Sequence, residues 1–170
     1  MRTLPLCILL LVAIACCLSG CGSGGGSTIS GQFGTLTFAG STNKTSYSSG
    51  ENVSLTFTVT NTGAAPVTIS GSGLNFPNNS SVPLAVRIER NGQVVMSLVS
   101  NAGNGGSTTL APGEVRTNTV IWDQKDDNNA QVPAGTYTLT MFLSASQVGS
   151  QNFTNLTDAL AAHPVSIIIQ

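Results

Sequence analysis

One short acidic segment holds the first candidates for chemistry. The stretch from Trp122 to Asn129 reads WDQKDDNN and places Asp123, Asp126 and Asp127 beside two asparagines. Carboxylate and amide oxygens of this kind can bind calcium, but an EF-hand loop also has a glycine at its sixth position and a closing glutamate, and both are missing here. A solvated turn is the favoured interpretation, a calcium site is the alternative, and no metal ligands are assigned.

Histidine chemistry depends on a single residue, His163, which precedes Pro164 near the end of the chain. A Ser-His-Asp triad would need this imidazole to lie close to both a serine and a carboxylate. The sequence around His163 does not show the pattern of a nucleophile elbow. We therefore expect a solvated loop histidine, no catalytic residues and no cofactor, and we predict that the protein is not an enzyme.

The four cysteines are confined to the start of the chain, at Cys7, Cys16, Cys17 and Cys21. Three of them fall in an apolar run, residues 4–17, which follows a single arginine at position 2. A basic residue, an apolar run and then small residues are typical of an export signal. The run is shorter than the about 20 residues that a permanent membrane-spanning helix needs. The sequence therefore predicts export.

The end of this apolar run resembles the bacterial lipobox. Residues 18–21 read LSGC: a large aliphatic residue stands three positions before Cys21, and two small residues lie between them. The resemblance implies a diacylglyceryl group on the Cys21 sulfur and cleavage just before it, and a thiolate is nucleophilic enough for this S-alkylation. Cys16 and Cys17 fit the pattern less well. A plain secretory signal with incidental cysteines is the alternative.

These features predict three segments: a lipoprotein signal peptide at 1–20, a lipidated cysteine with a Gly/Ser-rich tether at 21–30, and a folded domain at 31–170. The mature chain of 170 − 20 = 150 residues suits one domain and has no thiol for a disulfide or a cysteine metal site. The predicted location is the cell envelope, anchored to the bacterial membrane through Cys21. By resemblance to enterobacterial sorting rules, Gly22 rather than aspartate after the cysteine permits transfer to the periplasmic face of the outer membrane in a Gram-negative host.

Charge excludes one large class of partner. Charged residues make up 8% of the chain, and removing Arg2 from the six basic residues leaves five against seven acidic ones, for a mature net charge of −2. Nucleic-acid binding relies on clustered lysine and arginine side chains that neutralise phosphates. We therefore expect no nucleic-acid partner.

Alternation of apolar and polar residues dominates the rest of the chain. In residues 52–61 the apolar residues Val53, Leu55, Phe57 and Val59 alternate with serine and threonine, which is typical of a half-buried strand. Asn91-Gly92 predicts a type I′ hairpin. About eight short strands with regular turns predict an all-β, antiparallel β-sandwich or barrel. Strands are expected at 35–38, 52–61, 66–70, 84–90, 93–99, 115–122, 136–143 and 164–170, a short helix at 158–162, and long loops at 71–83, 100–113 and 144–163.

Three turn motifs in fixed order carry a family resemblance. An Asn-Thr-Gly turn joins two strands, a Pro-Gly-Glu turn leads into a strand that ends in Trp-Asp, and a Pro-Ala-Gly-Thr-Tyr turn starts the next strand. In this order, from Asn52 to Leu143, they resemble the BsuPI family of intracellular proteinase inhibitors. The resemblance implies an immunoglobulin-like β-sandwich of about eight strands and inhibition of a serine-type protease. The residues that carry it are Asn61, Gly63, Pro112, Gly113, Trp122, Asp123, Pro133, Gly135 and Tyr137.

Two of these aromatic residues have expected structural roles. Trp122 ends a strand and is expected to pack between the sheets rather than to anchor a partner. Tyr137 follows a Pro-x-Gly turn and is expected to make a hydrogen bond like that of a tyrosine corner.

Together these observations predict a lipid-anchored, non-enzymatic envelope protein that binds a protein partner through loops at one end of the sandwich, with a protease as the most specific candidate. The first alternative is a structural, assembly or adhesion module of the envelope that associates through strand edges. The second is a calcium- or carbohydrate-binding β-sandwich that uses the acidic segment at 123–129.

Overall fold

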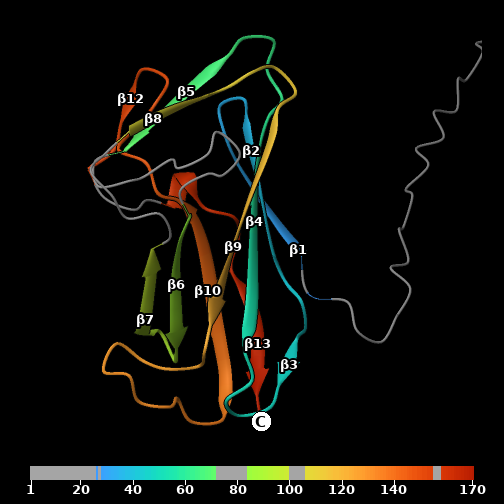
Figure 1. Cartoon of the computed structure of the whole chain (residues 1–170), viewed down its shortest axis with the longest axis vertical. Coiled ribbons are helices and arrows are strands. Elements are labelled where there is room, and N and C mark those ends of the chain that lie inside the picture. Colours follow the sequence, from blue (N-terminus) through green and yellow to red (C-terminus); the bar gives the residue numbers. More distant parts are fainter. Residues whose placement is uncertain (1–25, 27, 72–83, 100–105, 155–157) are drawn as a thin grey trace, which may run out of the picture.

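The structure is a computed structural model that describes residues 26, 28–71, 84–99, 106–154 and 158–170 (Figure 1). The predicted signal peptide, Cys21 and most of the predicted tether lie outside the described residues, as do residues 72–83 and 100–105 of the first two long loops. Within the described ranges, no helix has the length and apolar character that a membrane-spanning segment needs.

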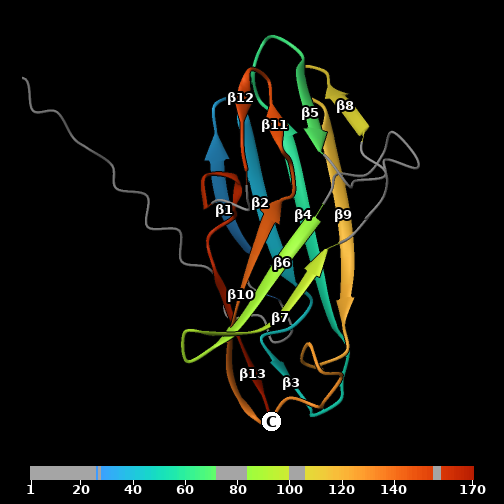
Figure 2. The ribbon, with the colours of Figure 1, turned by 90° about the vertical axis from the view of Figure 1, so that its left-hand side faces the viewer.

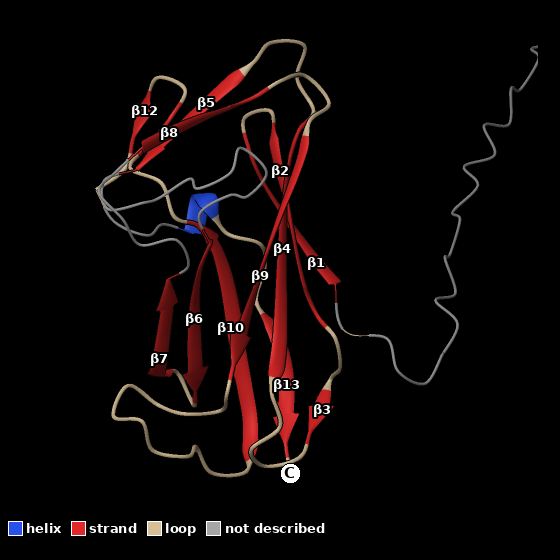
Figure 3. Ribbon diagram, viewed as in Figure 1, coloured by secondary structure: helices blue, strands red, loops and turns tan. Residues whose placement is uncertain are grey.

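The described chain is built from strands, with one short 3-10 helix, η1 at Asp158–Leu160 (Figure 3). This confirms the all-β prediction. The strands are β1 Thr28–Phe33, β2 Leu36–Thr42, β3 Ser46–Tyr47, β4 Val53–Asn61, β5 Val67–Gly71, β6 Leu84–Arg90, β7 Gln93–Val99, β8 Gly106–Leu110, β9 Val115–Trp122, β10 Gly135–Leu143, β11 Gln147–Val148, β12 Gln151–Asn152 and β13 Val165–Ile169.

Two main sheets form the predicted sandwich. One has the strand order β1-β2-β4-β9 and the other the order β3-β13-β10-β6-β7. A third sheet, β12-β11-β5-β8, lies at the end of the molecule away from the C-terminus (Figures 1 and 2). The pairings are antiparallel except for that of β13 with β3, which is parallel.

The core lies between the two main sheets and follows from the alternation in the sequence. The apolar residues of β4 are fully buried, and so are Leu139 and Met141 of β10. The rings of Phe38 and Phe57 stack at 5.8 Å between centroids. Each fully buried side chain of this size contributes about 1.5–3 kcal/mol relative to exposure. On the opposite face of β4, Thr56 and Thr119 pair through their hydroxyl oxygens at 3.1 Å.

The Asn91-Gly92 hairpin is confirmed. Arg90 pairs with Gln93 across the two turn residues, whose φ angles are 52° and 74°. A type I′ turn requires positive φ at both central positions, which asparagine and glycine adopt most readily.

Every strand expected from the sequence is present, with ends that move by a few residues, but several short strands were missed. β1 begins at Thr28, inside the segment expected as tether. β8 lies in the expected loop at 100–113, and β3, β11 and β12 have two residues each. The expected helix at 158–162 is a single 3-10 turn. These segments are polar or very short, so their neighbours in the sheets, rather than an apolar pattern, decide their conformation.

Candidate protein-binding site and its supports

Four of the nine motif residues meet at one end of the sandwich. Asn61 is fully buried at the end of β4. Its Nδ2 donates to the carbonyl oxygens of Ala65 at 2.9 Å and Leu110 at 3.0 Å, and its Oδ1 accepts from the Gly63 amide at 3.0 Å. Its backbone carbonyl accepts from the Gly113 amide at 2.8 Å. Asn61 therefore joins the Asn-Thr-Gly turn to the Pro-Gly-Glu turn, two motifs about 50 residues apart in the chain.

The Pro-Gly-Glu turn is fixed by its own side chains. Pro112 and Gly113 occupy its central positions, and Gly113 has a φ of 75°, which favours glycine. The Glu114 amide donates to the Ala111 carbonyl at 3.0 Å, and the Glu114 carboxylate accepts from the Ala111 amide at 2.7 Å and from Arg116 Nε at 2.6 Å. These hydrogen bonds, the one from Ala111 first, lower the pKa of Glu114 below its ordinary value. This end of the molecule is therefore held together by hydrogen bonds between the two turns and within the Pro-Gly-Glu turn.

The remaining motif residues lie at the end of β9 and around the start of β10, which pairs with the last residues of β13 near the C-terminus (Figure 1). Trp122 and Tyr137 are fully buried and meet edge to face, with 5.6 Å between ring centroids and an interplanar angle of 62°. Trp122 Nε1 donates to the Lys125 carbonyl at 2.8 Å, and the Tyr137 hydroxyl donates to the Pro133 carbonyl at 2.6 Å. Both structural roles expected for these aromatic residues are confirmed.

Arginine and glycine complete the surroundings of Tyr137. Arg90 lies over the Tyr137 ring at 5.8 Å and donates to the Ala134 carbonyl at 2.9 Å. Gly135 has a φ of 151°, and a Cβ there would come within 3.1 Å of the Arg90 guanidinium. Burial raises the pKa of Tyr137, and the charge of Arg90 opposes this. The Pro-x-Gly-Thr-Tyr motif is thus a packing motif in this protein.

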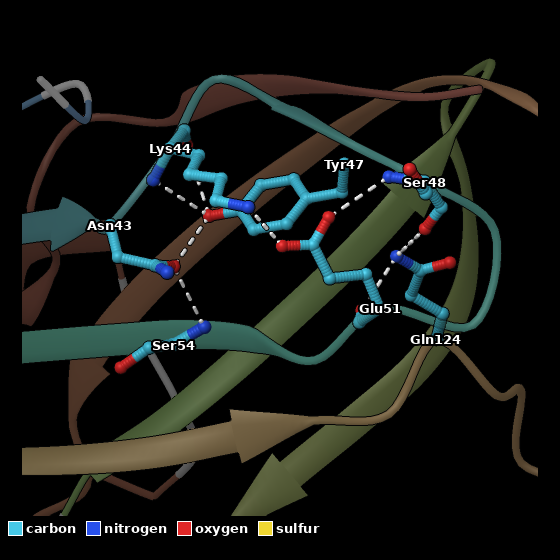
Figure 4. Close-up of polar contacts among 7 residues, drawn as sticks. All are labelled: Asn43, Lys44, Tyr47, Ser48, Glu51, Ser54 and Gln124. Atoms are coloured by element: carbon cyan, nitrogen blue, oxygen red, sulfur yellow. Dashed lines mark hydrogen bonds and ion pairs between the residues drawn. The ribbon is translucent and has the colours of Figure 1, made fainter. Parts of the chain in front are cut away.

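Gln124 supports the same end and was not singled out from the sequence. It is fully buried with a φ of 60°. Its Nε2 donates to the carbonyls of Ser48 at 2.9 Å and Glu51 at 2.7 Å (Figure 4). Its Oε1 accepts from the Gly50 amide at 2.8 Å. A glutamine beside an aspartate and a lysine looks like an exposed loop residue in the sequence, so no local signal identifies it.

A second polar network braces the β3 region (Figure 4). The Tyr47 hydroxyl bonds to Asn43 Oδ1 at 2.8 Å, and the same Asn43 oxygen accepts from the Ser54 amide at 3.1 Å. Burial raises the pKa of Tyr47, while its hydrogen bonding with the Lys44 backbone acts in the opposite direction. Lys44 and Glu51 form an ion pair that lowers the pKa of the Glu51 carboxyl.

These supports frame a loop at residues 123–131, named here the Asp126 loop, which has buried Gln124 at its base. Asp126 Oδ1 accepts from the amides of Asn128 and Ala130, each at 2.9 Å. The Asp126 amide donates to the Ala130 carbonyl, and the Asn129 amide donates to the Asp126 carbonyl, again at 2.9 Å. Residues 127–131 are nevertheless exposed. The tip of the loop is therefore presented to solvent in a conformation that Asp126 holds from within.

Asp127 attaches this loop to the edge strand β7. The Asp127 amide donates to the Val95 carbonyl at 3.2 Å, and Asp127 Oδ1 accepts from the Ser97 amide at 3.4 Å. Because β7 is an edge strand of the five-stranded sheet, these contacts occupy backbone groups that would otherwise be open to another strand.

The three aspartates of the loop serve different partners. Asp123 pairs with Lys125 at 3.1 Å, whereas Asp126 and Asp127 bond to backbone amides. In the parts of the chain that the structure describes, no three acidic, histidine or cysteine side chains are grouped as a metal ion would require. His163 lies elsewhere, exposed beside a pocket between β1 and β10.

The fold and the clustered motifs define an all-β sandwich with an exposed, internally braced loop. Comparison with known protein families matches residues 41–148 to the family described as BsuPI, intracellular proteinase inhibitor. The match covers more than half of the 170-residue chain. The chain therefore belongs to the BsuPI intracellular proteinase inhibitor family, which confirms the resemblance seen in the sequence.

Comparison with solved structures gives more distant similarities. A β-glucosidase from Listeria innocua is 10% identical with a TM-score of 0.46, and the match covers 79% of this chain but 16% of the glucosidase. A CARDB domain from Pyrococcus furiosus is 15% identical with a TM-score of 0.44, over 85% of this chain and 95% of that one. This chain spans 16% of the length of the glucosidase. A comparison with curated protein sequences finds no match.

Proposed function

We propose that this protein is a lipid-anchored proteinase inhibitor that acts outside the cytosol and contacts its target through the Asp126 loop. Membership of the BsuPI family points to a non-enzymatic protein with a protease as partner. Lipidation of Cys21, export to the envelope and the choice of loop are parts of the proposal. They rest on the lipobox-like residues 18–21 and on the geometry of the loop.

The conformation of the Asp126 loop is the observation that carries the choice of surface. Binding a protease requires a segment of chain to be ordered at the interface, and each side chain immobilised on binding costs about 0.5–1.5 kcal/mol. Here the backbone is already ordered, because Asp126 closes the tip, Asp127 bonds to β7, and the Trp122 indole holds the Lys125 carbonyl. An exposed loop with fixed backbone loses little entropy when it binds.

The location of the loop also agrees with docking. Its base is attached to the Trp122–Tyr137 pair and to buried Gln124, so the core holds the base of the loop in place. The tip itself carries the exposed small or polar side chains of residues 128–131, which are available to a partner.

Inhibition by the purified full-length chain tests the proposal. We expect inhibition of at least one protease in a panel of serine, cysteine and metallo classes at about micromolar concentration, with a serine protease as the most favoured target. Asp126→Ala removes the acceptor for two loop amides and should weaken inhibition about tenfold or more, because the loop must then be ordered on binding.

Asp123→Ala is the matched control. It removes the same charge three positions away, and its carboxylate pairs with the Lys125 side chain rather than with the amides of Asn128 and Ala130. We expect inhibition by this variant to stay within about twofold of the unchanged protein. Absence of inhibition across all classes would refute the inhibitor assignment, whereas equal inhibition by both variants would refute the role of the loop.

A further inference from the structure

A pocket of about 420 Å³ lies where the segment before β13 crosses β10 and β1. It is lined by Gln32 of β1, Arg87 of β6, Thr140 of β10 and the segment from Ala161 to Pro164. Its volume falls in the range of sites for small molecules. We propose that this pocket binds a small monocarboxylate that carries an apolar group.

The floor of the pocket is formed by two neighbouring strands. Thr140 and Arg87 are directly paired across β10 and β6. Leu139 and Met141, on either side of Thr140, belong to the main core. Because side chains alternate along a strand, Thr140 and Arg87 project from the opposite face of the sheet.

The wall of the pocket is the segment that precedes β13. The Ala162 amide donates to the Met141 carbonyl at 3.0 Å, and the His163 amide donates to the Ser30 carbonyl at 3.3 Å. The segment thus joins β10 to β1 of the other main sheet. The approach is close at Gly31, where a Cβ would lie 2.0 Å from the Ala161 carbonyl oxygen. The wall is therefore fixed by backbone contacts to both sheets.

Thr140 provides the observation that points to a ligand. Its side chain is 2% exposed, and its hydroxyl oxygen is buried without a hydrogen-bond partner in the structure. Buried hydroxyls in proteins almost always have a hydrogen-bond partner, since a buried hydroxyl without one destabilises the folded state. A ligand oxygen in the adjoining pocket would supply the missing acceptor or donor.

Arg87 supplies the charge that selects an anion. Its guanidinium lies over the Phe142 ring with 5.0 Å from Cζ to the ring centroid, and its Nε is 3.4 Å from a Glu89 carboxylate oxygen. These contacts orient the planar group, which is suited to binding a carboxylate. The neighbouring Glu89 charge disfavours an anion with two negative charges, such as phosphate.

The remaining lining residues favour an amphipathic ligand. Ala161, Ala162 and Pro164 present apolar surface, and Gln32 and His163 add polar groups. A carboxylate near Arg87 and Thr140 would place an attached aliphatic group against this apolar wall. This division of polar and apolar lining is usual for small-molecule sites.

Calorimetric titration of the full-length chain with N-acetyl-leucine tests the proposal, with N-acetyl-leucinamide as the uncharged probe of the same shape. We expect the acid to bind with a dissociation constant of about 1 mM or lower, and the amide about tenfold more weakly or not at all. Arg87→Gln should weaken binding of the acid about tenfold, and Thr140→Val about threefold or more.

Lys125→Gln is the control, because it removes the same charge from a lysine that pairs with Asp123 and does not line the pocket. It should leave binding unchanged. Equal binding of acid and amide, no binding of the acid at about 10 mM, or tighter binding of inorganic phosphate would each overturn the proposal. If a pocket variant fails to fold by circular dichroism, the comparison of acid with amide on the unchanged protein still decides. Protease inhibition is measured separately, so its failure leaves this test intact.

Discussion

Replacement of Asn61 by alanine tests the central structural argument, that one buried amide joins two turn motifs. The side chain is fully buried and makes three hydrogen bonds to backbone groups of residues 63, 65 and 110. At about 1 kcal/mol for each bond, and with the backbone groups left buried, the free energy of unfolding should fall by about 3 kcal/mol. For a domain of this size that corresponds to a melting temperature lower by about 6–12 °C.

Urea and thermal unfolding followed by circular dichroism measure this effect. Asn128→Ala is the control, since Asn128 has the same side chain but is exposed, and its replacement should change stability by less than about 0.5 kcal/mol. Asn61→Asp separates hydrogen bonding from volume. It keeps the shape and one acceptor, but it loses the two donated bonds and buries a charge against two carbonyl oxygens. We expect it to be at least as destabilising as alanine. A loss below about 1 kcal/mol for both variants would refute the reasoning.

Two further predictions concern lipidation of Cys21 and the dependence of stability on pH. Mass spectrometry of the protein from a membrane fraction should find Cys21 at the mature N-terminus with a diacylglyceryl group, and Cys21→Ser should release the protein from the membrane; an unmodified Cys21 in membrane-bound protein would contradict the lipobox interpretation. The pKa of Glu114 is lowered in the folded state, so its stabilising contribution is present above the ordinary glutamate pKa and is lost as pH falls through the lowered value. Glu114→Gln should therefore flatten the acid limb of a stability–pH curve, and an unchanged slope would contradict this assignment.

Comparing predicted and observed strands shows which parts of the fold the local sequence predicts. The alternation in β4 and the Asn91-Gly92 turn depend on side-chain period and backbone φ, which neighbouring residues largely specify. Both are present as predicted. β1 and β8 were missed because TISGQF and GSTTL lack a clear apolar alternation, and they become strands by pairing with β2 and β5.

The candidate site shows the same division. The acidic segment at 123–129 could be read as a solvated turn or a calcium loop, because residue type alone does not show what each carboxylate contacts. Only the structure shows that the Asp126 carboxylate accepts a hydrogen bond from its own loop and the Asp127 carboxylate accepts one from β7. Gln124 and the Thr140–Arg87 pocket carried no local signal, since their partners lie far away in the sequence.

The all-β class, the family, the main strands and the lipobox-like residues 18–21 can be read from the sequence, because they depend on periodicity, turn chemistry and short motifs. Which motif residues meet, which polar side chains are buried and which loop has a braced, exposed tip are visible only in the folded chain. Hydrogen-bond partners and burial follow from strand pairing between distant segments, and no single segment encodes that pairing.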